Sequence, residues 1–289
     1  MTNQEKWKRL STILDEAEAY GRAIGKLNFD MECCAPEEGM EQAGDDMALL
    51  GKHIHALTHS PEYAALVGEL HADGEGLSFA QRKTVEHLWE RYEKEKNLTE
   101  EFDHAWSVAA NRAYGKWLTA KKASDFSLFR DSLAEVVDFT RKAIDLRDEK
   151  PATYYNACLD DTEKGGSEAQ MDAFFGALKE RIVPLMRRIQ AEGKPIREDF
   201  LTRSCPIPEQ ERFSHYLLEA EGLRKSALVL MTTEHPFTTE FGPHDVRVTT
   251  HYFEDNFISN IFSTLHEGGH ALFMQNEPEE FWREHTAGS

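Results

Sequence analysis

Cysteine is scarce in this sequence. Only four of its 289 residues are cysteine, at positions 33, 34, 158 and 205, and no two of them form a C-x-x-C pair. Small secreted domains rely on many regularly spaced cysteines, so a disulfide framework is not expected here. A reducing compartment fits this pattern better, and we expect a cytoplasmic protein.

Long apolar runs are absent as well. No apolar stretch approaches the roughly 18 residues that indicate a membrane-spanning helix. The N-terminal segment M-T-N-Q-E-K-W is too polar to be the core of a secretory signal. We therefore expect neither a membrane span nor a signal peptide, and no membrane partner.

Basic residues are outnumbered and dispersed. The sequence has 33 Lys and Arg residues against 52 Asp and Glu residues, for a formal net charge of −19. No basic cluster is dense enough to follow a phosphate backbone, so nucleic acid is not an expected partner. A solvated helical surface accounts for the acidity.

Helical periodicity, in contrast, extends over most of the chain. Between residues 4 and 31, Leu10, Ile13, Leu14 and Ala17 open an apolar stripe through a charged segment. Similar patterns predict helices over residues 40–59, 61–72, 78–96, 99–121, 125–148, 167–192 and 209–233. No internal repeat, low-complexity segment or clear linker divides them, so we expect a single helical domain over residues 1–289.

Three details qualify this helical pattern. Residues 151–167 are rich in turn formers and predict a connection with one short helical turn. Pro184 is expected to kink or divide the helix over residues 167–192. His55 and His59 have the four-residue spacing of a metal pair, but no carboxylate accompanies them in the sequence, so we expect an exposed helical face.

One stretch has a convincing β pattern. Residues 246–253, V-R-V-T-T-H-Y-F, are β-branched and aromatic and begin with alternating apolar and polar positions. The segment 235–238 precedes them, joined through the turn formers of 241–243, which suggests a partner strand. The expected fold class is therefore mainly α, a multi-helix fold with a small antiparallel β-hairpin.

The segment that follows this hairpin contains an H-E-x-x-H motif. Apolar residues recur at helical spacing over residues 257–273, so the motif is expected on a helix. There His266 and His270, four residues apart, project from one face and suit two imidazole ligands on one zinc ion. Glu267 lies about 100° further round, where it reaches a metal-bound water as general base. The alternative is two hydrogen-bonded core histidines.

Two glycines occupy the middle of this motif. Gly268 and Gly269 each cost a helix interior roughly 1 kcal/mol relative to alanine. Their presence in an otherwise well-formed helix suggests the close approach of another backbone or of a substrate.

Three segments together resemble the M32 family of metallocarboxypeptidases, the carboxypeptidase Taq type. They are the tripeptide H-P-F at 235–237, the segment D-V-R-V-T at 245–249, and H-E-G-G-H-A-L at 266–272. The resemblance implies a mostly helical zinc-peptidase fold with a deep groove, usually a homodimer. It implies an enzyme that releases single residues from peptide C-termini and uses one divalent ion per chain, zinc or alternatively cobalt.

Carried over to this sequence, the resemblance makes His266 and His270 metal ligands and Glu267 the catalytic base. Two further residues are candidates for binding substrate. Arg247 would pair with the terminal carboxylate of a peptide, or would instead brace the hairpin by pairing with Asp245. His235 would bind substrate or only hold the turn.

The sequence also departs from the family pattern. In the family a third metal ligand is a glutamate on a following helix, in a His-Glu-Ser context, and no such context occurs before Ser289. The local candidates are Glu277, Glu279, Glu280, Glu284 and His285. We expect this chain to be the N-terminal part of a longer enzyme, truncated on its C-terminal side, with the third ligand beyond Ser289.

Two other functions compete with this assignment. A helical zinc oligopeptidase, which cuts inside short peptides, has a similar metal-binding helix, although the H-P-F and D-x-R-x-T segments argue against it. The other alternative is a catalytically incomplete helical scaffold that lacks the third metal ligand.

Overall fold

Helices make up most of the protein in a computed structural model that describes residues 1–201 and 203–286. The helices are α1 (Asn3–Cys33), α2 (Met40–Thr58), α3 (Pro61–Ala72), α4 (Phe79–Glu95), α5 (Glu100–Ala123), α6 (Ser127–Asp145), α7 (Tyr154–Thr162), α8 (Glu168–Glu192), α9 (Ile207–Ala220), α10 (Phe257–Gln275) and α11 (Glu279–Arg283). The strands are β1 (Leu228–Thr232), β2 (Thr238–Glu240) and β3 (Val246–Thr250). The predicted mainly α fold with a small β element is therefore confirmed.

Side-chain caps explain where several helices begin. Thr2, Ser60, Ser78 and Thr99 each accept a hydrogen bond from a backbone N–H of the first turn of the following helix. Such caps satisfy backbone donors that have no partner within the helix. The starts of α3, α4 and α5 therefore lie where the sequence predicts them.

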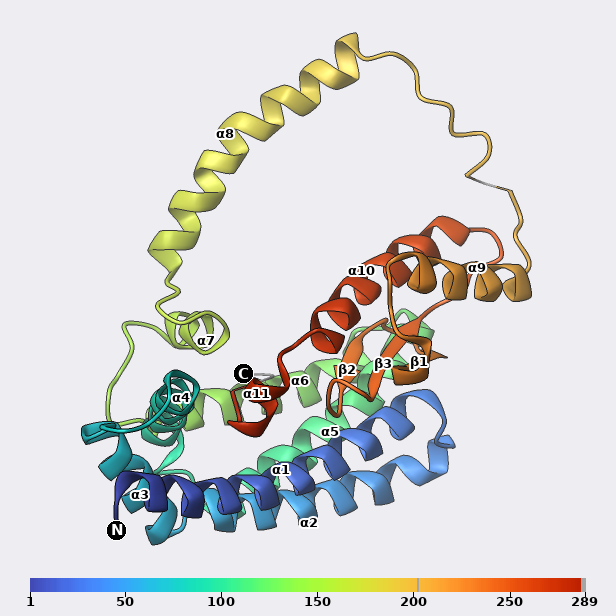
Figure 1. The fold of residues 1–289 in the computed structure, drawn as a ribbon. Helices are drawn as coiled ribbons and strands as arrows, with labels where there is room; N and C mark the ends of the chain where they lie inside the picture. Colours follow the sequence, from blue (N-terminus) through green and yellow to red (C-terminus); the bar gives the residue numbers. More distant parts are fainter. Residues whose placement is uncertain (202, 287–289) are drawn as a thin grey trace.

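The core is divided into two clusters of buried apolar side chains. The first joins α1, α3 and α4 and includes Leu10, Val67 and Leu70, each at most 1% exposed. The second lies among α9, β3 and α10 and includes Leu218, Val246, Val248 and Ala271. In Figure 1, α10 and α9 lie over the small sheet, so this second cluster supports the H-E-x-x-H helix.

The sheet has three strands in the order β1-β3-β2. β2 pairs with β3 in the antiparallel sense, as predicted, and Thr238 is opposite Val248. β1 pairs with β3 in the parallel sense, with Leu228 opposite Val246. This strand was not predicted.

The expected helix over residues 209–233 is wrong in its second half. α9 ends at Ala220, and Gly222 has a φ of +92°, a conformation that favours glycine and does not continue a helix. The segment L-V-L-M-T of β1 is apolar and compatible with either structure. Its pairing with the buried strand β3 makes it a strand.

The turn-rich segment and α8 also differ from expectation. α7 has 9 residues, which is more than the single turn predicted. α8 is one helix of 25 residues that includes Pro184, so the proline does not divide it, and the alternative of a kink stays a prediction. No residue of α8 is buried, and Figure 1 shows this helix and the segment after it as an open arch above the rest of the chain.

His55 and His59 do not lie on a bare exposed face. Both side chains are partly buried, His59 lies against the backbone of Glu95 at the end of α4, and the two rings stack at 3.8 Å between centroids. The Nδ1 atom of His55 lies 2.6 Å from Oδ2 of Asp103, which is 48 residues away in the sequence. The expectation was wrong because the fold supplies the carboxylate that the local sequence lacks.

Within the described residues, no helix is both long enough and apolar enough to cross a lipid bilayer.

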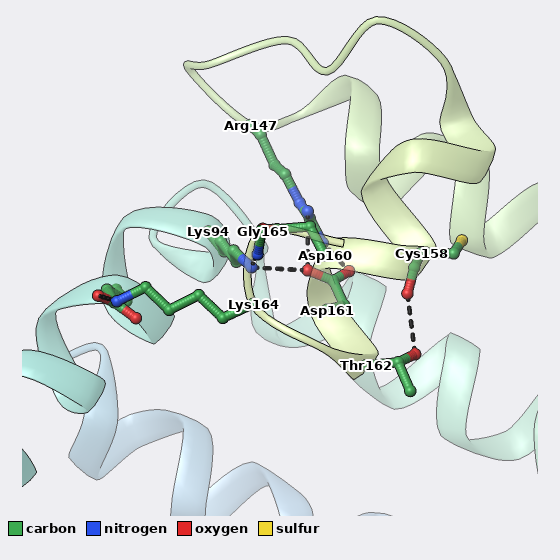
Figure 2. A network of polar contacts seen from close by, with 9 residues as sticks. Lys94, Arg147, Cys158, Asp160, Asp161, Thr162, Lys164 and Gly165 are labelled. Carbon is green, nitrogen blue, oxygen red and sulfur yellow. Dashed lines mark hydrogen bonds and ion pairs between the residues drawn. The ribbon is translucent and has the colours of Figure 1, made fainter. Parts of the chain in front are cut away.

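A network of ion pairs attaches α7 to α4. Figure 2 shows Lys94 of α4 beside Asp160 and Asp161 of α7, with Nζ–Oδ distances of 2.7 and 2.9 Å. Arg147 makes two hydrogen bonds to Asp161, and the backbone N–H of Gly165 donates to Asp160. These contacts hold the base of the arch on the helical body.

The hydrogen bond from Lys94 lowers the pKa of Asp160 below its ordinary 3.8. Burial raises the pKa of Asp161, but the bonds from Arg147 and Lys94 outweigh burial and lower it overall.

We expect Lys94→Met to reduce the free energy of unfolding by about 1 kcal/mol at pH 7, because the network is only partly exposed. A depressed carboxylate pKa stabilises the folded state above the unfolded pKa, and this stability is lost as the pH falls through the folded pKa. The loss caused by Lys94→Met should therefore become smaller as the pH falls through the lowered pKa values of Asp160 and Asp161.

Urea unfolding at pH 7 and at pH 2.5 measures this difference. Lys142→Met is the control, because Lys142 pairs with Asp138 one turn away on the same helix, α6. A loss for Lys94→Met no larger than that for Lys142→Met would contradict the role of the network.

Candidate metal centre

The inner face of α10 fixes which way the H-E-x-x-H motif points. The buried residues Asn260, Thr264, Glu267, Gly268, Ala271 and Gln275 recur every three or four positions. His266 and His270 lie on the opposite, exposed face, with ring centroids 4.9 Å apart. The histidines are therefore neighbours one turn apart, open to solvent, and not hydrogen-bonded core residues.

A buried polar cluster holds α10 against its neighbours. Oδ1 of Asn260 accepts hydrogen bonds from Ser214 of α9 at 3.0 Å, Thr250 of β3 at 2.8 Å and Thr264 at 3.1 Å. All four residues are 0% exposed. Because buried hydroxyls without partners are costly, these bonds fix the rotation of α10 about its axis.

The surroundings of Glu267 differ from those of the two histidines. It is 7% exposed, and its Oε2 lies 2.7 Å from the hydroxyl of Thr238 on β2. The same hydroxyl lies 2.9 Å from the backbone carbonyl oxygen of Glu267. The predicted offset between Glu267 and the histidines thus places its carboxylate between the helix and the sheet.

The two glycines of the motif have different surroundings. A Cβ on Gly268 would lie 1.9 Å from Oε2 of Glu221 and 3.1 Å from Leu218, both on or next to α9. The expected close approach therefore exists at Gly268, although side chains make it and not a backbone. Nothing lies within 4 Å of a Cβ built on Gly269, which faces solvent. Burial raises the pKa of Glu221, whose Oε2 has no hydrogen-bond partner within the described residues.

The local candidates for a third ligand point elsewhere. The ring of His285 is 4% exposed and lies against α1, with Nδ1 2.6 Å from Glu18 and Nε2 3.0 Å from Ser11. Glu277 lies near Glu240 of β2 and raises its pKa. Within the described residues, neither of these candidates forms a hydrogen bond or ion pair with His266 or His270.

The acids in and next to α11 differ in their surroundings. Glu279 pairs with Arg283 one turn along its own helix. Glu280 is exposed. Glu284, directly after α11, accepts a hydrogen bond from Thr84 at its backbone carbonyl, and its buried Oε2 has no hydrogen-bond partner within the described residues. Across the part of the chain that the structure describes, no three His, Cys, Asp or Glu side chains form a metal-binding group. His266 and His270 fit a divalent ion as two donors, and these residues supply no third.

Arg247 braces the strands in this structure. Its Nε and Nη2 atoms donate to the two carboxylate oxygens of Asp245 at 3.0 and 3.1 Å. The guanidinium also stacks on Phe29 of α1 and Phe241, 5.0 and 4.7 Å from the ring centroids. The contacts of Arg247 therefore agree with the bracing alternative. Its guanidinium is paired with Asp245 and is not open to the terminal carboxylate of a peptide.

His235 is exposed at the beginning of the segment that leads into β2. It is close enough to Glu32 of α1 to lower that carboxyl's pKa, although burial raises the pKa of Glu32 overall. Sequence reasoning did not single out Thr238. The one available signal was its place directly after the H-P-F tripeptide.

The carboxyl group of Glu240 makes a pH-dependent contribution to stability. Burial and, less strongly, the charge of Glu277 raise the pKa of Glu240 from 4.5 to about 7. A carboxyl whose pKa is raised on folding favours the folded state below the unfolded pKa, and this stability is lost as the pH rises through the folded pKa. We therefore expect the free energy of unfolding to fall between about pH 4.5 and 7, by up to about 3 kcal/mol at about 1.4 kcal/mol per pKa unit.

Glu240→Gln should remove most of this fall. Urea unfolding at pH 5 and pH 7.5 checks it, with Glu279→Gln at an exposed position as the control. An unchanged pH dependence in Glu240→Gln would contradict the assignment.

Comparison with known proteins places this geometry in context. The model of the carboxypeptidase Taq (M32) metallopeptidase family matches residues 9–289. Carboxypeptidase 1 of Bacillus subtilis is 32% identical over 274 residues, which are 94% of this chain and 54% of that protein. Thermostable carboxypeptidase 1 of Thermus thermophilus is 31% identical over 98% of this chain and 57% of its own length.

Solved structures agree with the sequence comparison. The BsuCP crystal structure has a TM-score of 0.90 and 31% identity over 96% of this chain and 55% of its own. The Apo-Mg structure of Pyrococcus furiosus carboxypeptidase has a TM-score of 0.82 and 31% identity, over 96% and 56%. This chain thus spans about half the length of these relatives. The chain belongs to the carboxypeptidase Taq (M32) metallopeptidase family.

Proposed function

We propose that this chain contributes the metal-binding helix of a metallocarboxypeptidase that releases single amino acids from the C-termini of peptides. The observation that supports the proposal most directly is that the two candidate ligands and the candidate base lie on different faces of α10. Two exposed histidines share one face, while the glutamate between them is buried and hydrogen-bonded. A metallopeptidase needs this separation between ligands and base.

In this proposal His266 and His270 hold one divalent ion, with zinc the first choice and cobalt the alternative. The bound ion would supply a Lewis acid for the scissile carbonyl and lower the pKa of a bound water. Glu267 then accepts a proton from the attacking water and returns it to the leaving amine. Its Oε2 is held by Thr238, and Oε1 accepts no hydrogen bond within the described residues, so one oxygen is available to a water.

The exposed face of α10 suits a peptide as substrate. Phe262, 68% exposed, lies one turn before His266, and Phe273, 70% exposed, lies one turn after His270. Apolar side chains exposed in a row with polar groups between them are typical of binding surfaces. We assign His235 to the substrate side of the sheet and Arg247 to the bracing of the strands. A homodimer and a cytoplasmic location remain part of the proposal.

The first test of the metal site is zinc retention. With zinc in excess, the purified protein is expected to bind about one zinc per chain through His266 and His270, measured by mass spectrometry of the protein in zinc buffer against the buffer alone. His266→Ala should lower zinc affinity at least about tenfold, because one of two histidine donors is lost. His215→Ala on α9 is the control, since His215 is exposed and outside the motif. No bound zinc in any of the three proteins would favour the metal-free scaffold.

Peptide hydrolysis tests the assignment of the base. Once the metal site has a third donor, the zinc-loaded enzyme should shorten an N-blocked peptide by single residues from its C-terminus, which mass spectrometry resolves. Glu267→Gln should lower kcat by about 100- to 10,000-fold without loss of zinc, because proton transfer is removed while the ligands remain. Normal turnover in Glu267→Gln would refute the role of the base, and cleavage inside the peptide would favour an oligopeptidase.

A further inference from the structure

The hydroxyl of Thr238 lies 2.7 Å from Oε2 of Glu267 and 2.9 Å from the carbonyl oxygen of the same residue. We propose that Thr238 is the positioning residue for the Glu267 carboxylate, and that the H-P-F and D-x-R-x-T segments serve to hold Thr238 in place. This inference rests on the proposed function, because it assigns a role relative to the proposed base.

A glutamate needs such a restraint to act as a base. Its side chain has three rotatable bonds, and a reacting group must be held within about 0.5 Å of its productive position. The single hydroxyl hydrogen of Thr238 is shared between one carboxylate oxygen and one helix carbonyl. The Thr238 hydroxyl thereby links the carboxylate both to the backbone of α10 and to β2.

The strand that presents Thr238 is too short to hold itself. β2 has 3 residues and lies at the edge of the sheet. Thr249 of β3, 0% exposed, secures its beginning. The backbone N–H of Phe237 donates to the Thr249 hydroxyl at 2.7 Å, and both the hydroxyl and the N–H of Thr249 donate to the Phe237 carbonyl. The last residue of each motif therefore joins the other directly.

The other end of β2 is secured by the first half of the D-x-R-x-T segment. The backbone N–H of Phe241 donates to the carbonyl of Asp245 at 2.8 Å across a turn in which Gly242 has a φ of +127°. Asp245 holds Arg247 through two hydrogen bonds, and Arg247 stacks on Phe241 and on Phe29 of α1. Both ends of the strand are thus fixed, with Thr238 opposite the fully buried Val248.

Three substitutions separate the hydroxyl of Thr238 from its bulk. Thr238→Val keeps the shape and removes the hydrogen bond, and Thr238→Ser keeps the hydrogen bond. Thr239→Val is the matched control, because successive side chains of a strand point to opposite faces. Crystal structures of the variants report on the carboxylate without any need for activity.

In Thr238→Val we expect the Glu267 carboxylate to move by more than about 1 Å or to occupy two positions, and in Thr238→Ser and Thr239→Val to stay within about 0.5 Å. With zinc and peptide, Thr238→Val should lower kcat about 10- to 100-fold, with KM and zinc content nearly unchanged, because the lost positioning affects the base and not binding. Thr238→Ser should retain activity within about threefold.

The two proposals fail in different ways. A parent protein with a complete zinc site that cleaves no peptide would contradict the proposed function, and the crystal structures would still decide the role of Thr238. An unmoved carboxylate in Thr238→Val would overturn the inference about Thr238, and so would full activity of that variant beside an active parent.

Discussion

The packing of α10 on β3 and α9 depends on one buried amide. Oδ1 of Asn260 is the common acceptor for hydroxyls from α9, β3 and α10 itself. These hydroxyls are buried and cannot bond to water instead. Any rotation of α10 would leave them without an acceptor, at a cost of about 1–3 kcal/mol for each lost bond. The outward direction of the histidines and the inward direction of Glu267 are consequences of this constraint.

The same logic gives the D-x-R-x-T segment a physical meaning. In a strand, alternate residues share a face, so Asp245, Arg247 and Thr249 are on one side and Val246 and Val248 on the other. The valines are 0% exposed and fill the second core. The polar face fixes β2 and, through Phe29, connects the sheet to α1. One strand therefore supports the core and the hydrogen-bonded edge at the same time.

Local periodicity predicts most of this fold because most of its elements are helices with one apolar stripe. It also predicts the relation of His266, Glu267 and His270, since that relation depends only on 3.6 residues per turn. β1 could not be predicted, because a short apolar segment becomes a strand through pairing with a distant partner. The contacts of Thr238 and the pairing of His55 with Asp103 escaped for the same reason, since each joins residues that only the tertiary structure brings together.

The contact between His285 and Glu18 spans 267 positions of the chain, whereas the Phe237–Thr249 contact beside the candidate site spans 12. Closing a flexible loop costs about 0.6 kcal/mol more for each doubling of its length, which makes the longer closure about 3 kcal/mol costlier in chain entropy. The strands that hold Glu267 can thus assemble without waiting for α1 and α11 to meet. The order of folding would favour early pairing of these strands, with the contact between the two ends of the described chain forming last.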